Sequence, residues 1–318
     1  MSTSALTEAM PELLILARHG EAAGQLVRDQ QAQDTSGYTE EFRNTSTIRH
    51  NLTRDGFAQA KSIASYLARH ILNSNVLPAG IIDRGLSAAT HRARQSLGAV
   101  LLEGVRMDIP IIREVTGSVD RIGTEGTDDW PDFWVTSDPR LNEIEFGWHE
   151  ASPRAEMDAA YPDAATARAR DHFTARPPGG ESPADVLARA RDTMGAVTRM
   201  HAKGVKSVYM STHGRFRTMF DFAIRGLDAL DWDEFNRQNK VENAELLFLA
   251  RRNPLTGEPA PTLRWRATAN PWRDPDTPPV WEEFVAPRTI GLENLLRGIP
   301  QEWRDDQPAD RNGRAQIL

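Results

Sequence analysis

Two His–Gly pairs occupy matching positions in this chain and are its best candidates for nucleophilic or acid–base chemistry. Arg18–Glu21 (RHGE) follows the apolar run Leu13–Ala17, and Thr212–Gly214 (THG) follows a second apolar run, Ser207–Met210. Where a strand ends and a helix begins, backbone N–H groups favour anions, and arginine and histidine side chains can hold or attack a phosphoryl group. A single RHG turn is equally compatible with a surface loop, but two matched pairs favour one shared phosphate pocket.

Composition narrows the kinds of chemistry and partner. The chain has 318 residues, a net charge of −7 and no cysteine. The negative charge argues against nucleic acid as a partner, and the missing thiols exclude disulfides, thiolate metal sites and cysteine catalysis. The eight histidines show no metal-ligand spacing such as HExxH, so we expect neither a metal nor a cofactor. The N-terminus does not resemble a signal peptide and no apolar run is long enough to span a bilayer, which predicts a soluble, cytoplasmic protein without membrane contact.

The elements that must position these residues alternate between short apolar runs and helical patterns, which is typical of an α/β fold. We therefore expect a three-layer α/β/α sandwich with a mostly parallel central sheet. The expected strands are Leu13–Ala17, Ala79–Ile82, Ile109–Ile112, Ser207–Met210, Ala244–Ala250 and Leu263–Ala267. The expected helices span residues 54–71, 90–102, 183–202, 215–224 and 231–237, the first capped by Thr53 and the third by Ser182.

The length predicts one catalytic domain over residues 1–270 with loop insertions at about 26–51 and 116–140. The first insertion is polar and is interpreted either as a lid over the substrate or as a disordered surface loop. Residues 271–318 are rich in proline and tryptophan and form a C-terminal extension that we expect to pack on the domain or on a partner. A homodimer in which this tail crosses to a neighbouring copy is one hypothesis.

The ordered motifs resemble those of the histidine phosphatase superfamily, also called phosphoglycerate mutase-like. The hallmark is an apolar strand that ends in RHGE, here at Glu21. Further similar segments follow in the family's order: Leu52–Gly56 with Gln59–Ala60, Arg92–Ser96, Leu141–Gly147, Pro178–Ser182, Ser211–Gly214 and Asn243–Glu245. The resemblance covers about residues 13–250, and the tail after Asn270 lies outside it.

The resemblance implies a role for each of six residues. His19 is the nucleophile, Glu143 the proton donor and His213 a second catalytic histidine, while the phosphate is bound by Arg18, Arg92, His213 and Gln25. Two alternatives stay open, since Glu145 rivals Glu143 on the same side of an extended segment and Arg94 rivals Arg92 on the same helix.

Some positions depart from the family pattern. Ala22 stands where Ser or Thr is common, Gln25 stands in place of an asparagine phosphate ligand, and Ala88 replaces a serine before Arg92. Glutamine keeps the amide donor but adds a methylene.

These features predict a metal-independent phosphatase that hydrolyses a small phosphomonoester through a phosphohistidine on His19. The mutases of the family usually carry Trp-Asn after RHGE and an FTGW-type stretch, and this chain has neither. The alternatives are a phosphoglycerate mutase-type phosphotransferase and a catalytically silent binding protein on the same fold. The presence of Arg18, His19, Arg92, Glu143 and His213 argues against the silent protein.

Overall fold

A computed structural model describes residues 10–30, 34–115, 133–284, 295–297 and 299–301. Its contacts divide the chain into two compact units, Met1–Ala286 and Pro287–Leu318. The first unit holds every motif discussed above. Of the second unit, only residues 295–297 and 299–301 are described.

The first unit is built on a seven-stranded sheet whose strand order is β3-β2-β4-β1-β5-β6-β7. The strands are β1 Leu13–Arg18, β2 Arg84–Ser87, β3 Val135–Ser137, β4 Ser207–Thr212, β5 Leu246–Ala250, β6 Trp265–Ala269 and β7 Glu282–Glu283. The four strands β3, β2, β4 and β1 are parallel to one another, whereas β5, β6 and β7 add antiparallel pairs at one edge. Since β6 is antiparallel to β5 and β5 to β1, β6 runs in the same direction as the parallel strands.

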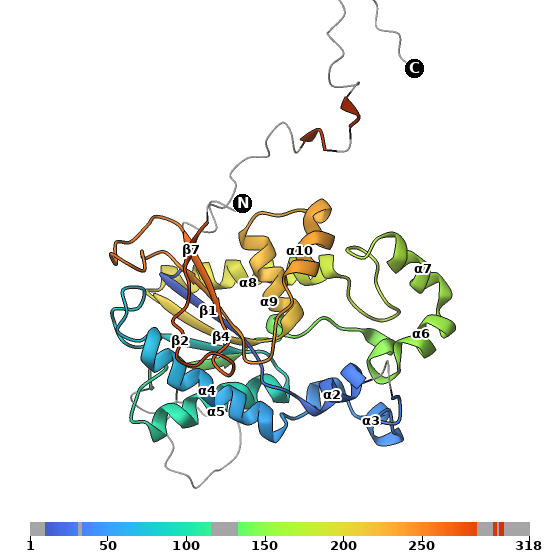
Figure 1. Cartoon of the computed structure of the whole chain (residues 1–318), viewed down its shortest axis with the longest axis horizontal. Coiled ribbons are helices and arrows are strands. Elements are labelled where there is room, and N and C mark those ends of the chain that lie inside the picture. The colour runs from blue at the N-terminus through green and yellow to red at the C-terminus, as the bar shows by residue number, and fades with distance from the viewer. Residues whose placement is uncertain (1–9, 31–33, 116–132, 285–294, 298, 302–318) are drawn as a thin grey trace, which may run out of the picture. The chain divides into compact units, whose positions relative to one another are not determined.

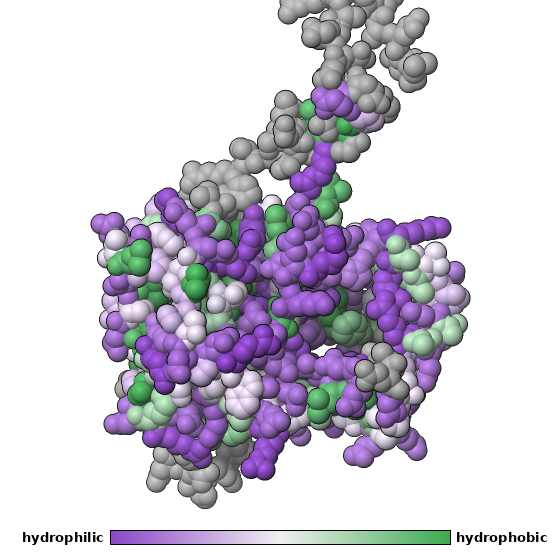
Figure 2. All heavy atoms as spheres, in the orientation of Figure 1, coloured by the Kyte–Doolittle hydropathy of each residue, from purple (hydrophilic) through white to green (hydrophobic). Residues whose placement is uncertain are grey.

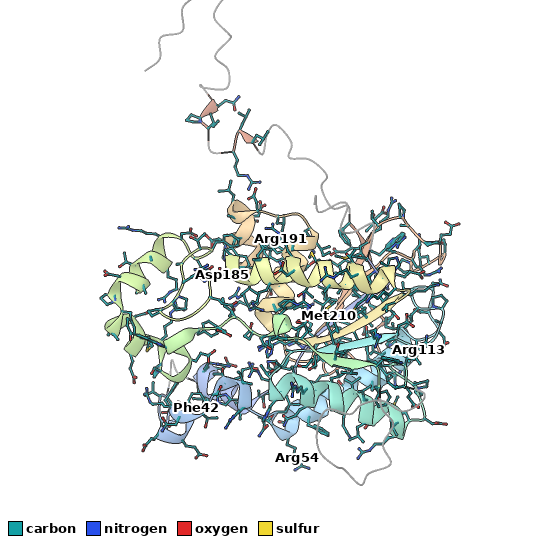
Figure 3. The ribbon with its side chains drawn as sticks, turned by 180° about the vertical axis from the view of Figure 1, so that it is seen from behind. Phe42, Arg54, Arg113, Asp185, Arg191 and Met210 are labelled. Carbon is teal, nitrogen blue, oxygen red and sulfur yellow. The ribbon has the colours of Figure 1, made fainter. Side chains whose placement is uncertain are left out.

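Helices cover both faces of the sheet (Figure 1). On one face lie α4, Arg54–His70, and α5, His91–Arg106; on the other lie α8, Pro183–Ala202, and α9, Gly214–Ile224. Figure 3 shows the same layers from behind, with Met210 in the sheet between them. This arrangement confirms the predicted α/β fold with helices on both sides of a central sheet.

The alternation of side chains along β1 explains the two layers. Leu13, Ile15 and Ala17 belong to the hydrophobic cluster shared with α4 and α5, whereas Leu14 and Leu16 belong to the cluster shared with α8 and α9. All five side chains are almost completely buried. A strand buried on both faces has no polar side to alternate with, which is why its sequence is one continuous apolar run.

Two of the main helices begin at the predicted caps. The Thr53 hydroxyl accepts a hydrogen bond from the Gly56 N–H at 2.9 Å, at the start of α4. Ser182 and Asp185 form a reciprocal capping box at the start of α8, with Pro183 at the first helical position. Both caps satisfy backbone donors that have no partner inside the helix.

The shorter helices lie in the segments that connect the main elements. They are α2 Ala23–Gln30, α3 Glu40–Asn44, α6 Arg154–Ala160, α7 Pro162–Arg170 and α10 Trp232–Gln238, with 3₁₀ turns η1 Thr47–Arg49, η2 Pro139–Leu141, η3 Gly147–Ala151 and η4 Ala229–Asp231. Figure 1 shows α2–α3 and α6–α7 projecting on the same side of the body. None of the helices in the described ranges combines the length and the apolar character that crossing a bilayer requires.

Several sequence expectations need correction. The strand expected at Ala79–Ile82 forms a few residues later, as β2 at Arg84–Ser87. The strand expected at Ile109–Ile112 does not form, and Ile112 makes only an isolated bridge to Ile82. The insertion at 26–51 contains α3, η1 and most of α2, so its described residues are not a structureless loop. Within the insertion at 116–140, β3 and the start of η2 are ordered, while residues 116–132 lie outside the described ranges.

The segment after Asn270 packs on the sheet and on α4 as far as residue 284. The Tyr66 hydroxyl on α4 donates to the Thr277 carbonyl at 3.0 Å, and β7 pairs with β6. Trp281 lies 5.9 Å from the ring of Phe248. Trp303 lies outside the described residues, and the extension over 271–318 as a separate part stays a prediction.

Candidate active site

Strands β1 and β4 bring the two histidines together. The strands are parallel neighbours, and their register pairs Arg18 with Thr212, so His19 and His213 follow at the same edge of the sheet. The His19 N–H donates to the Thr212 carbonyl at 3.0 Å. The two imidazole rings are 4.9 Å apart, centroid to centroid, and meet edge to face. The sequence expectation that the two His–Gly pairs share one site is therefore met in space.

The ring of His19 is fixed in one tautomer. Its Nδ1 lies 2.5 Å from the carbonyl oxygen of Gly20, and because a carbonyl only accepts, Nδ1 carries the proton. On the other side, Arg92 Nε donates to His19 Nε2 at 3.2 Å, so Nε2 presents its lone pair. Burial, followed by the charges of Arg92 and Arg18, holds the pKa of His19 well below its usual value. The imidazole is thus neutral at neutral pH, with one unprotonated nitrogen.

His213 is equally buried and neutral. Its Nε2 lies 3.1 Å from the Thr90 hydroxyl, and its Nδ1 has no partner among the described residues. Burial, with the charge of Arg92 second, lowers the pKa of His213 well below the usual value. A buried ring nitrogen without a hydrogen-bond partner costs free energy unless a ligand or a water molecule bonds to it. The Nδ1 atom of His213 is therefore available to bind a ligand.

Two arginines flank the histidines. Arg92 is buried, and its Nη1 donates to the Thr47 carbonyl at 2.6 Å; burial lowers its pKa to about 10. Arg18 Nη1 donates to the Val241 carbonyl at 2.5 Å, while its buried Nε has no partner in the described part of the chain. The rival Arg94 is exposed and donates to the Ser137 hydroxyl. The structure therefore brings Arg92, and not Arg94, to His19.

Glu143 lines a cavity of about 240 Å³ together with Arg92, Thr90 and Thr47. One carboxylate oxygen, Oε1, accepts the backbone N–H groups of Ile144 and Arg215, each at 3.1 Å. These two bonds hold the carboxylate in place through Oε1.

Two further carboxylates, Glu145 and Glu150, line the same cavity. Glu150 accepts from the Thr47 hydroxyl at 2.6 Å, and Glu145 is exposed. Burial lowers the pKa of both Arg18 and Arg92, and the negative charge of Glu143 raises both again. Glu143 therefore lies close to the two arginines of the site.

The backbone that carries Glu143 is held by Arg189, a residue that the sequence analysis missed. On α8, its Nη1 donates to the carbonyls of Arg140 and Asn142 at 2.6 and 3.1 Å, and its Nη2 to that of Glu143 at 3.3 Å. Glu181 neutralises the guanidinium at 2.7 Å. The available signal was an arginine placed directly before the buried Ala190, inside the apolar stripe of a helix.

The glycines of the two motifs bring β1 and α4 into direct backbone contact. A Cβ on Gly20 would lie 2.0 Å from the carbonyl oxygen of Gly56, and a Cβ on Gly56 would lie 1.9 Å from that of Glu21. Side chains complete this contact: the Thr53 hydroxyl donates to the Glu21 carboxylate at 2.7 Å, and the Gly20 N–H donates to the Ser96 hydroxyl at 3.0 Å. The RHGE, LTxxG and RARQS-type segments are thus one packed unit behind His19.

Gln25, the remaining predicted phosphate ligand, makes no hydrogen bond to either histidine among the described residues. It lies on α2, where its amide donates to the Asp29 carboxylate at 3.2 Å, and no contact joins it to His19 or Arg92 within the described ranges. Its role in phosphate binding stays a prediction. Within the same ranges, no group of three His, Asp or Glu side chains is arranged to hold a metal ion.

Comparisons with known proteins agree with this architecture. The sequence profile described as "Histidine phosphatase superfamily (branch 1)" matches residues 130–251, which include Glu143 and His213. No curated protein sequence matches the chain.

Solved structures resemble the fold over most of the chain. The alpha-ribazole phosphatase from Shigella flexneri is 17% identical over 89% of this chain and 100% of its own, with a TM-score of 0.51. Bacillus stearothermophilus YhfR is 18% identical over 76% of this chain and 92% of its own, with a TM-score of 0.51. At such identities the likeness establishes the fold. The profile match over residues 130–251 and the ordered motifs are features that the chain shares with branch 1 of the histidine phosphatase superfamily.

Proposed function

We propose that this protein is a metal-independent phosphatase that hydrolyses a phosphomonoester through a phosphohistidine on His19. The observation that carries the proposal is the tautomer of His19. The Gly20 carbonyl accepts a hydrogen bond from Nδ1–H, and the unprotonated Nε2 accepts one from Arg92 Nε, so the nitrogen with the lone pair lies beside the guanidinium. A neutral, oriented imidazole beside a guanidinium is the arrangement that an in-line attack on phosphorus needs.

In the first step, His19 Nε2 forms a bond to phosphorus while the bond from phosphorus to the leaving oxygen breaks. Arg18, Arg92 and the Nδ1 side of His213 stabilise the negative charge on the transferring group. Glu143, in its protonated form, donates a proton to the departing alkoxide. The product alcohol leaves, and the phosphoryl group stays on His19.

In the second step, water attacks the phosphohistidine. The Glu143 carboxylate takes a proton from that water, the bond between phosphorus and Nε2 breaks, and inorganic phosphate leaves. His19 regains its lone pair and Glu143 its proton, so the protein returns to its starting state. The positive charge that this chemistry needs comes from the two arginines.

The main test compares three proteins on an aryl phosphate in the presence of chelator: the wild type, His19→Ala and His91→Gln. His91 is an exposed histidine at the first position of α5 and serves as the matched control. We expect the His19 variant to lose at least about 10³-fold in kcat/KM and the control to retain activity. Rapid quenching of the wild type should trap one phosphoryl group per chain on His19. Activity in folded His19→Ala, or its loss on chelation in the wild type, would overturn the proposal.

The role of Glu143 is tested by leaving groups of different basicity. Glu143→Gln should slow hydrolysis of an alkyl phosphate by about 10²- to 10⁴-fold, the usual contribution of a general acid. It should slow phosphoryl transfer from 4-nitrophenyl phosphate far less, because nitrophenolate leaves without a proton. Glu145→Gln is the matched control and should show no such difference. A leaving-group dependence that appears in the Glu145 variant would reassign the proton donor.

A phosphotransferase of the mutase type predicts a different partition of the phosphohistidine. In that case the trapped phosphoryl group would pass to an added hydroxy acid faster than to water. Single-turnover measurements with and without such an acceptor separate the two activities.

A further inference from the structure

A second cavity, of about 340 Å³, adjoins the one that contains Glu143. The two share three lining residues, Arg28, Ile144 and Phe146. The walls of the second cavity come from α2, α6, α7, the start of α8 and the start of α9, with apolar surface from Tyr38, Phe146 and Pro177 among others. Figure 2 shows the surface hollowed between these elements, and Figure 3 shows Asp185 at the first turn of α8 on this side of the molecule. This second cavity, which we call the outer cavity, is where the alcohol half of a substrate would lie.

Three arginines of the outer cavity already have carboxylate partners. Arg154 lies 3.7 Å from the Asp158 carboxylate. Arg168 donates to Asp158 at 2.7 Å, and Arg176 pairs with Asp185 through both Nε and Nη2. Their charges serve to hold α7 and the start of α8 in place.

Arg215 differs from these three arginines. Its Nη1 donates to the neutral amide oxygen of Asn236, and its guanidinium carbon lies 5.2 Å from the centre of the Trp232 ring. Among the described residues, no carboxylate lies within 4.0 Å of its guanidinium nitrogens. Burial lowers the pKa of Arg215, and the nearby charge of Glu143 offsets only part of that effect, without a direct ion pair to the guanidinium.

The backbone of Arg215 is also connected to two residues of the candidate active site. It lies two residues after His213, and its backbone N–H is one of the two donors that fix Glu143 Oε1. A group bound by the Arg215 side chain would therefore sit on the leaving-group side of Glu143, with the phosphoryl group at the histidines. An anion there would give the Arg215 guanidinium a direct ion-pair partner.

We propose that the preferred substrate is a phosphomonoester whose alcohol half carries a second anionic group, a carboxylate or a second phosphate, bound by Arg215 in the outer cavity. The apolar wall at Phe146, Ile144 and Tyr38 takes the carbon body between the two charges. This inference rests on the proposed phosphatase activity and names the class of substrate for it.

The kinetic test uses phenyl phosphate, para-carboxyphenyl phosphate and hydroquinone bisphosphate. The wild type should prefer one or both charged substrates by at least 10-fold in kcat/KM. Arg215→Gln keeps the backbone donor to Glu143 and should reduce that preference by roughly 10- to 100-fold, the size of a hydrogen bond to a charged group. Arg176→Gln, which removes an arginine paired with Asp185 from the same cavity, should keep it. The charged substrate that loses more in Arg215→Gln identifies the anion as a carboxylate or a phosphate.

Binding to non-hydrolysable analogues separates this inference from the proposed function. Calorimetry compares benzylphosphonate with para-carboxybenzylphosphonate and para-xylylenediphosphonate. The wild type and His19→Ala should bind at least one of the two charged analogues more tightly than benzylphosphonate, and Arg215→Gln should lose that difference. Absence of turnover with all three substrates would remove the phosphatase proposal while leaving this measurement intact. Equal losses on charged and uncharged ligands in Arg215→Gln would overturn the anion site, because they would show that Arg215 acts through Glu143 or through packing.

Discussion

At the residue scale, the proposed mechanism places two opposite requirements on charge at the site. A nucleophilic imidazole must stay unprotonated, whereas the phosphate that it attacks needs positive charge close by. Burial and the charges of Arg92 and Arg18 all lower the pKa of His19, so the same arginines that would attract a phosphate also keep His19, the proposed nucleophile, neutral. The carbonyl of Gly20 then decides which nitrogen carries the proton.

The buried histidines give stability a defined dependence on pH. In the unfolded chain each imidazole binds a proton below about pH 6.5, whereas in the folded protein His19 and His213 stay neutral to a much lower pH. The unfolded state therefore binds more protons as the pH falls, and the folded state loses stability below about 6.5. Each buried histidine accounts for up to about 1.4 kcal/mol of this loss between pH 7.5 and 5.5.

Urea unfolding of the wild type and of His213→Gln at the two pH values measures this contribution. The loss of unfolding free energy on acidification should be smaller in the variant by about 1 kcal/mol. Carboxylates titrate in both proteins and cancel in the comparison. An equal loss in the two proteins would contradict a neutral His213 in the native state.

Arg92 and Arg94 offer a matched pair for the phosphate contact, since both lie in the first turn of α5. Arg92 is buried against His19, while Arg94 is exposed and donates to Ser137. We expect Arg92→Gln to lower kcat/KM by at least about 10²-fold, because it removes a charged donor from the transition state, and Arg94→Gln to change it less than about 3-fold. Steady-state kinetics on one aryl phosphate decide this, and a larger loss in the Arg94 variant would restore the alternative that the sequence left open.

At the element scale, the start of α4 lies against the turn that follows β1 because each segment has a glycine at the contact, Gly56 on α4 and Gly20 in the turn. Gly56→Ala would place a methyl group 1.9 Å from the Glu21 carbonyl oxygen, which is backbone and cannot turn aside. We expect this variant to lose about 2–4 kcal/mol of unfolding free energy and to lower kcat by moving the RHGE turn.

Gly98→Ala is the control for that substitution. Gly98 lies inside α5, and a Cβ there would meet nothing within 4 Å. Because alanine favours the helix over glycine, this variant should gain roughly 0.5–1 kcal/mol. Denaturant melts of the two variants beside the wild type provide the measurement. A Gly56 variant as stable as the wild type would show that α4 can shift without cost.

The elements that the sequence predicted well are those with strong local signals. The strand ending in RHGE is a continuous apolar run, and α4 and α8 carry both caps and an apolar stripe. The strand expected at Ala79–Ile82 was displaced because β2 contains Arg84 and Gly85, and its burial comes from β4 and β3 on either side, which no local pattern reveals. The helices α6 and α7 were not predicted, since their residues are mostly polar or alanine and only Met157 is buried.

The site divides in the same way. Arg18, His19, Arg92, Glu143 and His213 stand in recognisable motifs, and the structure places the last four around one cavity or in contact with its walls. Thr90, Arg189 and Arg215 lie in no such motif. Each of the three acts through a hydrogen bond to a residue far away in the sequence, Thr90 to His213 and the other two to Glu143. Such contacts are known only once the fold is known.

At the scale of the whole molecule, the sheet is completed by a segment that lies beyond the predicted catalytic domain. β7 pairs with β6, and Trp281 and Phe284 each pack against one of the two hydrophobic clusters. Asn270 and Arg273 also bind the Glu242 carboxylate, near the Val241 carbonyl that holds Arg18. By its packing, the segment over 271–284 therefore belongs to the first compact unit, which also carries both histidines.

Two truncations separate that segment from the rest of the tail. A chain that ends at Ala286 keeps β7 and both aromatic contacts, so we expect its thermal midpoint and kcat/KM to match those of the full chain. A chain that ends at Asn270 exposes the edge of β6 and uncovers Phe248, and should lose several kcal/mol of stability. If that chain does not fold, Trp281→Ala in the full protein, with the half-exposed Trp272→Ala as its control, measures the same contact.

The same preparations test the hypothesis that the tail links two copies of the chain. If residues 287–318 hold a homodimer, the protein that ends at Ala286 elutes with the mass of one chain while the full protein elutes with the mass of two, and the difference grows clearer as concentration rises. Equal elution masses and equal midpoints for the two proteins contradict that hypothesis. Since the truncation leaves the sheet and both histidines untouched, an accompanying fall in kcat/KM would instead mean that residues 287–318 contribute to the site.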